Sequence, residues 1–86
     1  MPAVTLYSGS FCGSCIRAKT LLERRGIAYT EVSVEDHPGL REELLARSGR
    51  RTLPQVYVGE HCVGGADELR ALDASGELMK MVQTKE

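Results

Sequence analysis

Two cysteines separated by two residues, Cys12 and Cys15, are the side chains of this sequence best suited to chemistry. They follow a short run of strand-forming residues and lead directly into a segment with helical spacing of its apolar residues. The unpaired N–H groups and the positive dipole end at the start of a helix stabilise a thiolate. We therefore expect Cys12 to be the exposed, acidified and attacking thiol. Cys15, which would share a face with Ala18, Leu21 and Leu22, should be the buried, less acidic thiol that resolves a disulfide.

The cysteine pair has two alternative interpretations, a zinc site and a structural disulfide. Zinc in a closed site needs four ligands, and the further candidates are His37, His61 and Cys62. His61 and Cys62 are neighbours in a strand-like run, so their side chains should point to opposite faces and give poor zinc geometry. A disulfide that closes so small a ring removes little chain entropy. The pattern therefore favours redox chemistry, which is typical of two cysteines spaced in this way beside a βαβ unit.

Length and composition indicate one ordinary globular domain over residues 1–86. Of the 86 residues 42% are hydrophobic and 27% are charged, and the formal net charge is −1. Mixed charges argue against nucleic acid as a partner, because phosphate binding needs a basic face. We see no apolar run of membrane-spanning length and no signal peptide. Three cysteines do not suggest a secreted disulfide framework, so we expect a reducing cytoplasm. We also expect a monomer with no membrane partner.

Strand and helix patterns alternate along the first half of the chain. A strand over residues 4–7 precedes the cysteines, and a helix over residues 13–25 follows them. The helix should stop at Gly26, because glycine readily adopts the left-handed conformation that ends helices. A second strand is expected over residues 27–34, which are rich in β-branched and aromatic side chains.

The middle of the chain should contain a second helix and a hairpin. Asp36 is expected to cap that helix, with Pro38 in its first turn. Two short strands follow at residues 55–58 and 61–63. Gly59-Glu60 between them has the composition of a two-residue hairpin turn with glycine first.

Two glycines, Gly64 and Gly65, break the last strand before a third helix, which Gly76 should end. Residues 77–82 then form a last short amphipathic helix. The resulting order is β-α-β-α-β-β-α-α. The first two strands are joined by a helix and should be parallel, whereas the last two form an antiparallel hairpin.

Four features together resemble the glutaredoxin family of the thioredoxin superfamily, over almost the whole chain. They are the length and three segments in the order Cys12-Gly13-Ser14-Cys15, Thr52-Leu53-Pro54 and Gly64-Gly65-Ala66-Asp67. Residues 41–50 also look like small bacterial dithiol glutaredoxins. The resemblance implies an α/β (α+β) thioredoxin/glutaredoxin fold, in which a four-stranded mixed sheet is flanked by helices.

The resemblance also implies a glutathione site. In the family the proline that matches Pro54 is cis and faces the cysteines, which leaves the backbone of Leu53 free to pair with the extended tripeptide. A helix start is a ready carboxylate site, and the resemblance assigns this one to the γ-glutamyl end of glutathione. The glycyl carboxylate is assigned to two arginines. The implied glutathione-binding residues are Arg41, Arg51, Thr52, Leu53, Pro54, Gly65, Ala66 and Asp67.

The implied activity is that of a glutathione-dependent thiol–disulfide oxidoreductase. Cys12 would be the nucleophile, Cys15 the resolving thiol and glutathione the co-substrate, with glutathionylated or disulfide-bonded proteins as partners. Most dithiol relatives have Pro-Tyr between the cysteines, where this chain has Gly13-Ser14. Many relatives also have a lysine where this chain has Gly9. One cation near the thiolate is therefore missing, and the helix start and Arg51 must contribute more.

Gly13 also supports an alternative function. Relatives with glycine or serine after the first cysteine include some that assemble a [2Fe–2S] cluster between two subunits, with glutathione as co-ligand. In this chain the metal ligand would be Cys12 from each of two copies. A third interpretation, a thioredoxin-like reductant without glutathione, is disfavoured by the segment from Gly64 to Asp67. Cys62 is expected to be a small, semi-buried apolar residue.

Overall fold

A four-stranded mixed sheet forms the centre of the computed structural model, which describes residues 3–83. The strands lie in the order β2-β1-β3-β4. Their bounds are Val4–Ser8 for β1, Thr30–Ser33 for β2, Gln55–Val58 for β3 and His61–Gly64 for β4. β1 pairs parallel to β2 and antiparallel to β3, and β3 pairs antiparallel to β4. The predicted parallel pair and the predicted hairpin are both confirmed.

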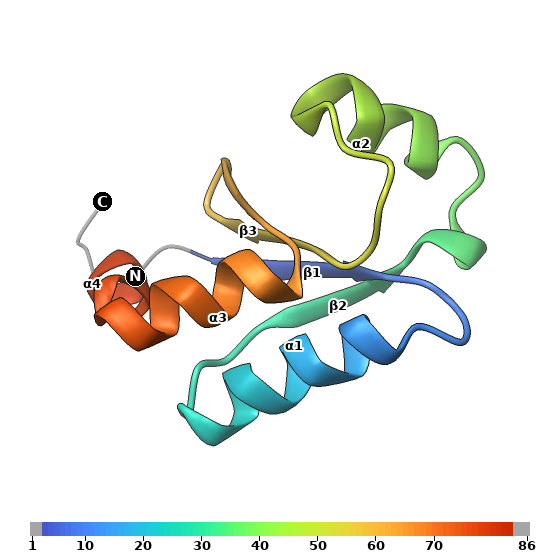
Figure 1. The fold of residues 1–86 in the computed structure, drawn as a ribbon. Coiled ribbons are helices and arrows are strands. Elements are labelled where there is room, and N and C mark those ends of the chain that lie inside the picture. The colour runs from blue at the N-terminus through green and yellow to red at the C-terminus, as the bar shows by residue number, and fades with distance from the viewer. Residues whose placement is uncertain (1–2, 84–86) are drawn as a thin grey trace.

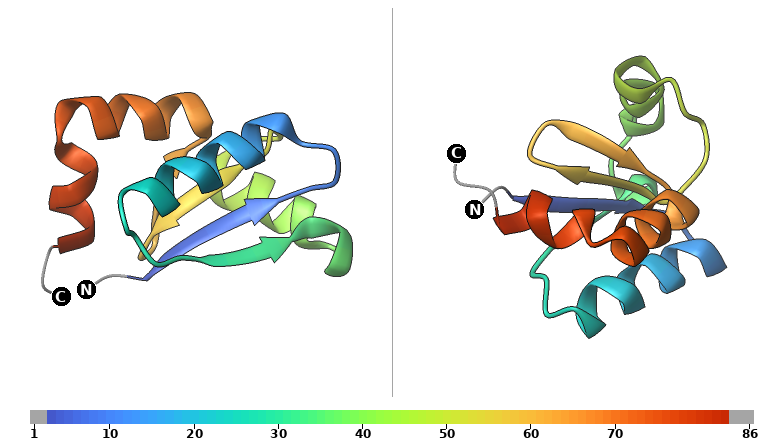
Figure 2. Two further views of the ribbon diagram at one scale, coloured as in Figure 1. Left: turned by 90° about the horizontal axis from the view of Figure 1, so that it is seen from below. Right: turned by 60° about the vertical axis from the view of Figure 1, so that its left-hand side comes forward.

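Helices cover both faces of this sheet. Their bounds are Gly13–Arg24 for α1, Leu40–Ser48 for α2, Ala66–Ser75 for α3 and Glu77–Gln83 for α4. α1 and α3 lie side by side on one face, and α2 lies on the opposite face (Figure 1; Figure 2, right). The expected four-stranded sheet flanked by helices is therefore confirmed. None of the helices in residues 3–83 has the length and apolar character needed to cross a membrane.

The alternation of side chains along the strands divides the core into two layers. Val4 and Leu6 of β1 pack with Val56 and Val58 of β3 in the larger layer. Tyr57, between the two valines, faces the other way and belongs to the smaller layer against α2. The larger layer also includes Ala18, Leu22, Ile27, Val63, Leu69, Leu78 and Val82. This layer joins α1 and α3 to the central strands and therefore fixes how both helices lie on the sheet.

The second strand is shorter than the sequence predicts. A strand is expected over residues 27–34, whereas β2 covers only Thr30–Ser33. The Ile27 N–H donates to the Leu22 carbonyl oxygen at 3.0 Å, which closes the end of α1. At the other end, Val34 begins a short 3₁₀ turn. Ile27 and Val34 are both buried, so these β-branched residues serve the core and not the sheet.

The prediction that Asp36 caps the second helix is wrong. Asp36 ends the 3₁₀ turn, and α2 begins at Leu40 with Gly39 as its N-cap residue. Gly39 has a φ of 86°, a left-handed conformation that glycine adopts without strain. The Leu40 N–H donates to the His37 carbonyl oxygen at 3.1 Å. Pro38 therefore lies in the turn before the helix, because the chain must reverse there before α2 can pack on the sheet.

Candidate active site

Cys12 lies at the N-cap position of α1, and Cys15 lies in the first turn of the same helix. The two cysteines form a disulfide, with their Cα atoms 5.2 Å apart. Cys12 is half-buried, whereas Cys15 is only 2% exposed. The predicted difference in burial is confirmed. Cys12 is thus the sulfur that an incoming thiol or disulfide can reach.

The start of α1 surrounds the Cys12 sulfur with favourable electrostatics for an anion. Cys12 Sγ accepts a hydrogen bond from the Cys15 N–H at 3.1 Å. The extended backbone of Cys12, with φ of −109° and ψ of 99°, turns its side chain back over the first helical turn. That turn contains no acidic residue, so no carboxylate within it neutralises the positive end of the helix. A reduced Cys12 would therefore be stabilised as a thiolate.

The turn before β3 lies against the disulfide. The Leu53–Pro54 peptide bond is cis, as the resemblance implies. The Leu53 carbonyl oxygen lies 3.8 Å from Cys12 Sγ. Pro54 is buried, and a Cβ built on Gly65 would lie 3.4 Å from the Pro54 carbonyl oxygen. Gly65 at the start of α3 therefore lies close to the same turn that faces Cys12.

Gln55 fixes the shape of that turn, a role that the sequence pattern does not reveal. Its side chain is buried, and Nε2 donates to the carbonyl oxygens of Arg50 at 2.8 Å and Thr52 at 3.3 Å. Its Oε1 accepts a hydrogen bond from the Ser48 hydroxyl at 3.0 Å. These bonds hold the backbone on both sides of Arg51. A polar residue at the start of an otherwise apolar strand was the one signal available in the sequence.

Arg41 of α2 and Arg51 of the turn line one pocket of about 320 Å³, together with Glu42 and Leu45. Within residues 3–83, Arg51 has no carboxylate partner. Arg41 Nη2 lies 3.6 Å from Glu35 Oε1, so its charge is shared with that carboxylate. The structure thus brings together the two arginines implied for a carboxylate, with Arg51 the less neutralised of the two.

Glu35 also connects this pocket to the loop before Cys12. Its Oε1 accepts a hydrogen bond from the Ser10 N–H at 2.9 Å. A Cβ built on Gly9 would lie 2.8 Å from Leu53 Cδ1 and 3.7 Å from Arg41 Nη2. Leu53 therefore occupies the space that a side chain at position 9 would need. Arg41 brings a cation close to the position where the lysine of many relatives would begin.

Ala66 and Asp67 begin α3 and line a second pocket, of about 280 Å³, which Arg17 also lines. The first N–H groups of a helix have no acceptor within the helix. In the described part of the chain no side chain accepts a hydrogen bond from the Ala66 or Asp67 N–H. The N–H of Gly65, by contrast, donates to Glu68 Oε1 at 2.7 Å. The two remaining donors form a site suited to a carboxylate.

Glu68 holds this helix start in place. Its carboxylate accepts a hydrogen bond from the Gly65 N–H and forms an ion pair with Arg50, with 2.9 Å between Oε1 and Nη2. The hydrogen bond from Gly65, followed by the positive charge of Arg50, lowers the pKa of Glu68 below its ordinary value. Gly64 has a φ of 110°, and a Cβ there would lie 2.9 Å from Glu68 Cγ, so only glycine fits. The sequence pattern did not indicate this role, because the N-cap residue is Gly65 and only the glutamate half of a capping box is present.

A family model and the curated relatives of this chain indicate the same protein family. The glutaredoxin family model matches residues 4–63. The chain is 45% identical over 78 residues to a glutaredoxin of Pseudomonas aeruginosa, covering 91% of this chain and 93% of that protein. It is 41% identical over 78 residues to glutaredoxin 3 of Escherichia coli K12, covering 91% of this chain and 94% of that protein.

Solved structures agree with this family. The solution structure of a glutaredoxin from Brucella melitensis has a TM-score of 0.87 and 41% identity, covering 100% of this chain and 94% of that one. The crystal structure of a buckwheat glutaredoxin–glutathione complex has a TM-score of 0.88 and 27% identity, covering 94% of this chain and 76% of that one.

The Glu68 contact predicts a pH-dependent contribution to stability. A carboxylate whose pKa is lower in the folded state stabilises the fold above its unfolded pKa, and this stabilisation is lost as the pH falls through the folded pKa. We expect Glu68→Gln to lower the free energy of unfolding by about 1 kcal/mol at neutral pH, because it weakens a helix cap. The difference from wild type in urea denaturation should shrink progressively as the pH is lowered below about 4.

Glu60→Gln is the matched control for this experiment. Glu60 is exposed in the hairpin turn and has no hydrogen bond or ion pair with another residue of the described chain. It should leave the free energy of unfolding unchanged at neutral and at acidic pH. Equal losses for the two variants, or a Glu68→Gln loss that persists in acid, would show that Glu68 does not act through its ionised carboxylate.

Proposed function

The chain belongs to the glutaredoxin family and is a thiol–disulfide oxidoreductase, and we propose that it uses glutathione to reduce glutathione mixed disulfides and protein disulfides. The observation that supports this best is the half-buried Cys12 at the start of α1, 3.8 Å from the Leu53 carbonyl of the cis turn. The similarity of the fold to a buckwheat glutaredoxin solved in complex with glutathione also supports the use of glutathione.

In the first step the Cys12 thiolate attacks the glutathionyl sulfur of a mixed disulfide. The substrate S–S bond breaks as the Cys12–glutathione S–S bond forms, and the electron pair leaves with the protein or small thiol, which takes a proton from solvent. The Cys15 N–H and the positive end of α1 stabilise the attacking thiolate before this step. The leaving thiol therefore departs from the glutathionyl sulfur, which stays bonded to Cys12 at the start of α1.

Two routes then regenerate the free Cys12 thiolate. In one, the thiolate of a second glutathione attacks the bound glutathionyl sulfur, forming glutathione disulfide and releasing Cys12. In the other, the Cys15 thiolate attacks the Cys12 sulfur and releases glutathione, which leaves the Cys12–Cys15 disulfide seen in the structure. Two glutathione molecules then reduce that disulfide. The second route also permits reduction of protein disulfides, because Cys15 can resolve a mixed disulfide with a protein.

We propose that glutathione lies extended along the backbone of Leu53, in the manner of an added strand. Its glycyl carboxylate would enter the pocket of Arg41 and Arg51. Its γ-glutamyl carboxylate would accept hydrogen bonds from the N–H groups of Ala66 and Asp67. Thr52, Pro54 and Gly65 would shape the backbone between these ends. The free charge of Arg51 and the free donors at the start of α3 support this placement.

This cycle requires a compartment supplied with reduced glutathione. We therefore propose a cytoplasmic location, with glutathionylated and disulfide-bonded proteins as substrates. A monomer suffices for the reaction, since each group named above comes from a single chain.

Gly13 favours a second candidate function, a [2Fe–2S] cluster between two copies. A Cβ built on Gly13 would meet no atom within 4 Å, and the residue is exposed, which leaves open space beside Cys12. The contribution of this chain would be the Cys12 thiolate, with glutathione thiolates completing a four-thiolate set. Anaerobic incubation with iron, sulfide and glutathione should then give a coloured dimer that Cys12→Ser does not form. A colourless monomer would contradict this function.

Serine substitutions separate the roles of the two thiols. Cys12→Ser should abolish reduction of a glutathionylated substrate, because no thiolate remains at the helix start. Cys15→Ser should keep much of that activity through the route that uses a second glutathione, and should lose reduction of protein disulfides. Turnover in a coupled assay of glutathione disulfide formation measures both. The reverse pattern, with Cys15 essential and Cys12 dispensable, would refute the assignment.

Arg51→Gln should raise KM for glutathione by about fivefold and change kcat little, because it removes an exposed cation from the glycyl carboxylate. Arg47→Gln is the control of equal charge. Arg47 stacks on the Tyr57 ring, 4.7 Å from its centroid, and does not line the pocket of Arg41 and Arg51. An unchanged KM in Arg51→Gln, or an equal rise in Arg47→Gln, would contradict the proposed placement of glutathione.

A further inference from the structure

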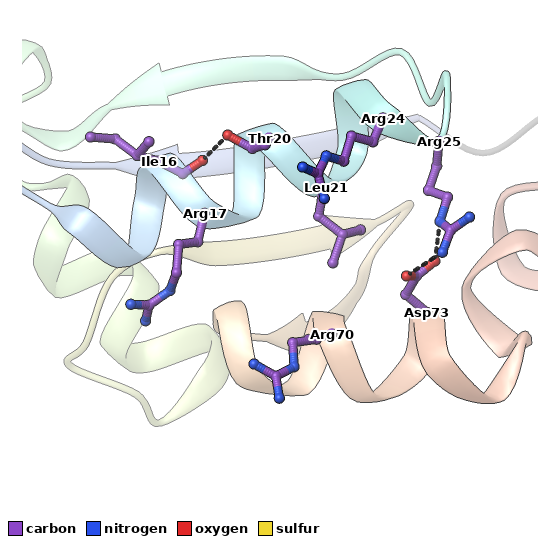
Figure 3. A pocket seen from close by; sticks show the side chains of 8 residues that line it. All are labelled: Ile16, Arg17, Thr20, Leu21, Arg24, Arg25, Arg70 and Asp73. Carbon is purple, nitrogen blue, oxygen red and sulfur yellow. Dashed lines mark hydrogen bonds and ion pairs between the residues drawn. The ribbon is translucent and has the colours of Figure 1, made fainter.

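A groove of about 610 Å³ between α1 and α3 has no role in the cycle described above. Four of the side chains that line it are arginines: Arg17 and Arg24 extend from α1, Arg25 follows that helix, and Arg70 extends from α3 (Figure 3). Asp73 of α3 lines it as well. We call this feature the arginine groove.

Most of the positive charge in the arginine groove is not neutralised by the protein. Arg25 donates to both carboxylate oxygens of Asp73, at 2.7 and 3.0 Å, and this pair bridges the helices at one end (Figure 3). Asp73 is the one acidic side chain among the groove's lining residues. Among residues 3–83, Arg17, Arg24 and Arg70 have no carboxylate partner. Three guanidinium groups therefore face one groove on a chain whose formal net charge is −1.

The arginine groove begins next to the redox centre. Ile16 lines the groove, and its N–H donates to the Cys12 carbonyl oxygen at 3.2 Å. Arg17 lines both the groove and the smaller pocket at Ala66 and Asp67. A chain lying in the groove would thus run along α1 away from the reactive sulfur, and would not occupy the pocket of the glycyl carboxylate.

Apolar surface beside Cys12 favours a protein as the occupant. Phe11 is fully exposed with a φ of 55°, and Ile16 is 61% exposed. These two large apolar side chains flank the segment from Cys12 to Cys15 in the sequence. Exposed apolar groups beside arginine are typical of protein interfaces. Nucleic acid would need a basic face that extends beyond one short groove, which a net charge of −1 does not favour.

We propose that the arginine groove docks an acidic segment of the protein substrate whose mixed disulfide Cys12 attacks. This inference rests on the proposed glutathione-dependent activity and adds the class of preferred substrate, proteins with carboxylates close to the modified cysteine. Arginine pairs with carboxylates through two parallel hydrogen bonds. Opposite charges also speed encounter between partners. Arg24 and Arg70 are then specificity-determining residues. The attack of the Cys12 thiolate on the mixed disulfide is unchanged.

The test compares two glutathionylated peptides of equal length, one with runs of about six glutamates on both sides of the cysteine and one with glutamines there. A run of that length can extend along α1 from Cys12 to Arg24. The wild-type protein should reduce the glutamate peptide with a kcat/KM about fivefold higher at low ionic strength. The preference should fall to near unity in the Arg24→Gln/Arg70→Gln double variant, and for wild type in about 0.5 M salt. Arg47→Gln, a charge change on α2, should keep most of the wild-type preference.

Equal kcat/KM values for the two peptides with wild type would overturn the docking proposal, as would a preference that persists in the double variant. Failure of wild type to reduce either peptide with glutathione would instead contradict the proposed function, so the two failures are distinct. Inhibition by a single-stranded oligonucleotide, at concentrations where a glutamate peptide of equal charge does not inhibit, would assign the groove to nucleic acid and overturn the proposal as well.

Discussion

The hydrogen bond from the Cys15 N–H to Cys12 Sγ marks the constraint on which the site depends. A sulfur at the N-cap gains most from the free donors and the helix dipole when it is ionised. This requires α1 to begin directly at Cys12, with no acidic residue in its first turn. The core provides that start, because Leu22 anchors α1 on the valines and leucine of the central strands.

Groups distant in sequence reach Cys12 because β3 lies beside β1. Their antiparallel register pairs Tyr7 with Gln55, so the start of β3 meets the end of β1, where the Cys12 loop begins. Leu53 arrives at the sulfur for this reason. Gln55 and Glu68 then fix the backbone of the turn and of the α3 start through buried or partly buried polar contacts. Neither touches the sulfur, yet both hold the groups that would bind a ligand next to it.

The parts of this arrangement that depend on local chemistry could be predicted from the sequence. Cysteine spacing at a strand–helix junction, glycine stops and a glycine-first hairpin turn each act within a few residues. The expected strand over residues 27–34 was too long because burial of Ile27 and Val34 overrode strand propensity. The expected cap at Asp36 failed because that residue ends a 3₁₀ turn, and the chain must still reverse before α2 begins at Leu40. The arginine groove depends on α1 and α3 lying side by side. On either helix alone the same arginines indicate only a solvated face.

The measurement that tests this account most directly is the pH dependence of Cys12 alkylation in the Cys15→Ser/Cys62→Ser variant, folded and in urea. We expect folded Cys12 to react already at its full rate at neutral pH, whereas the unfolded thiol should reach its full rate only in alkaline solution. A folded rate that rises with pH in parallel with the unfolded thiol would be the opposite result. It would show that the start of α1 does not hold this sulfur ionised.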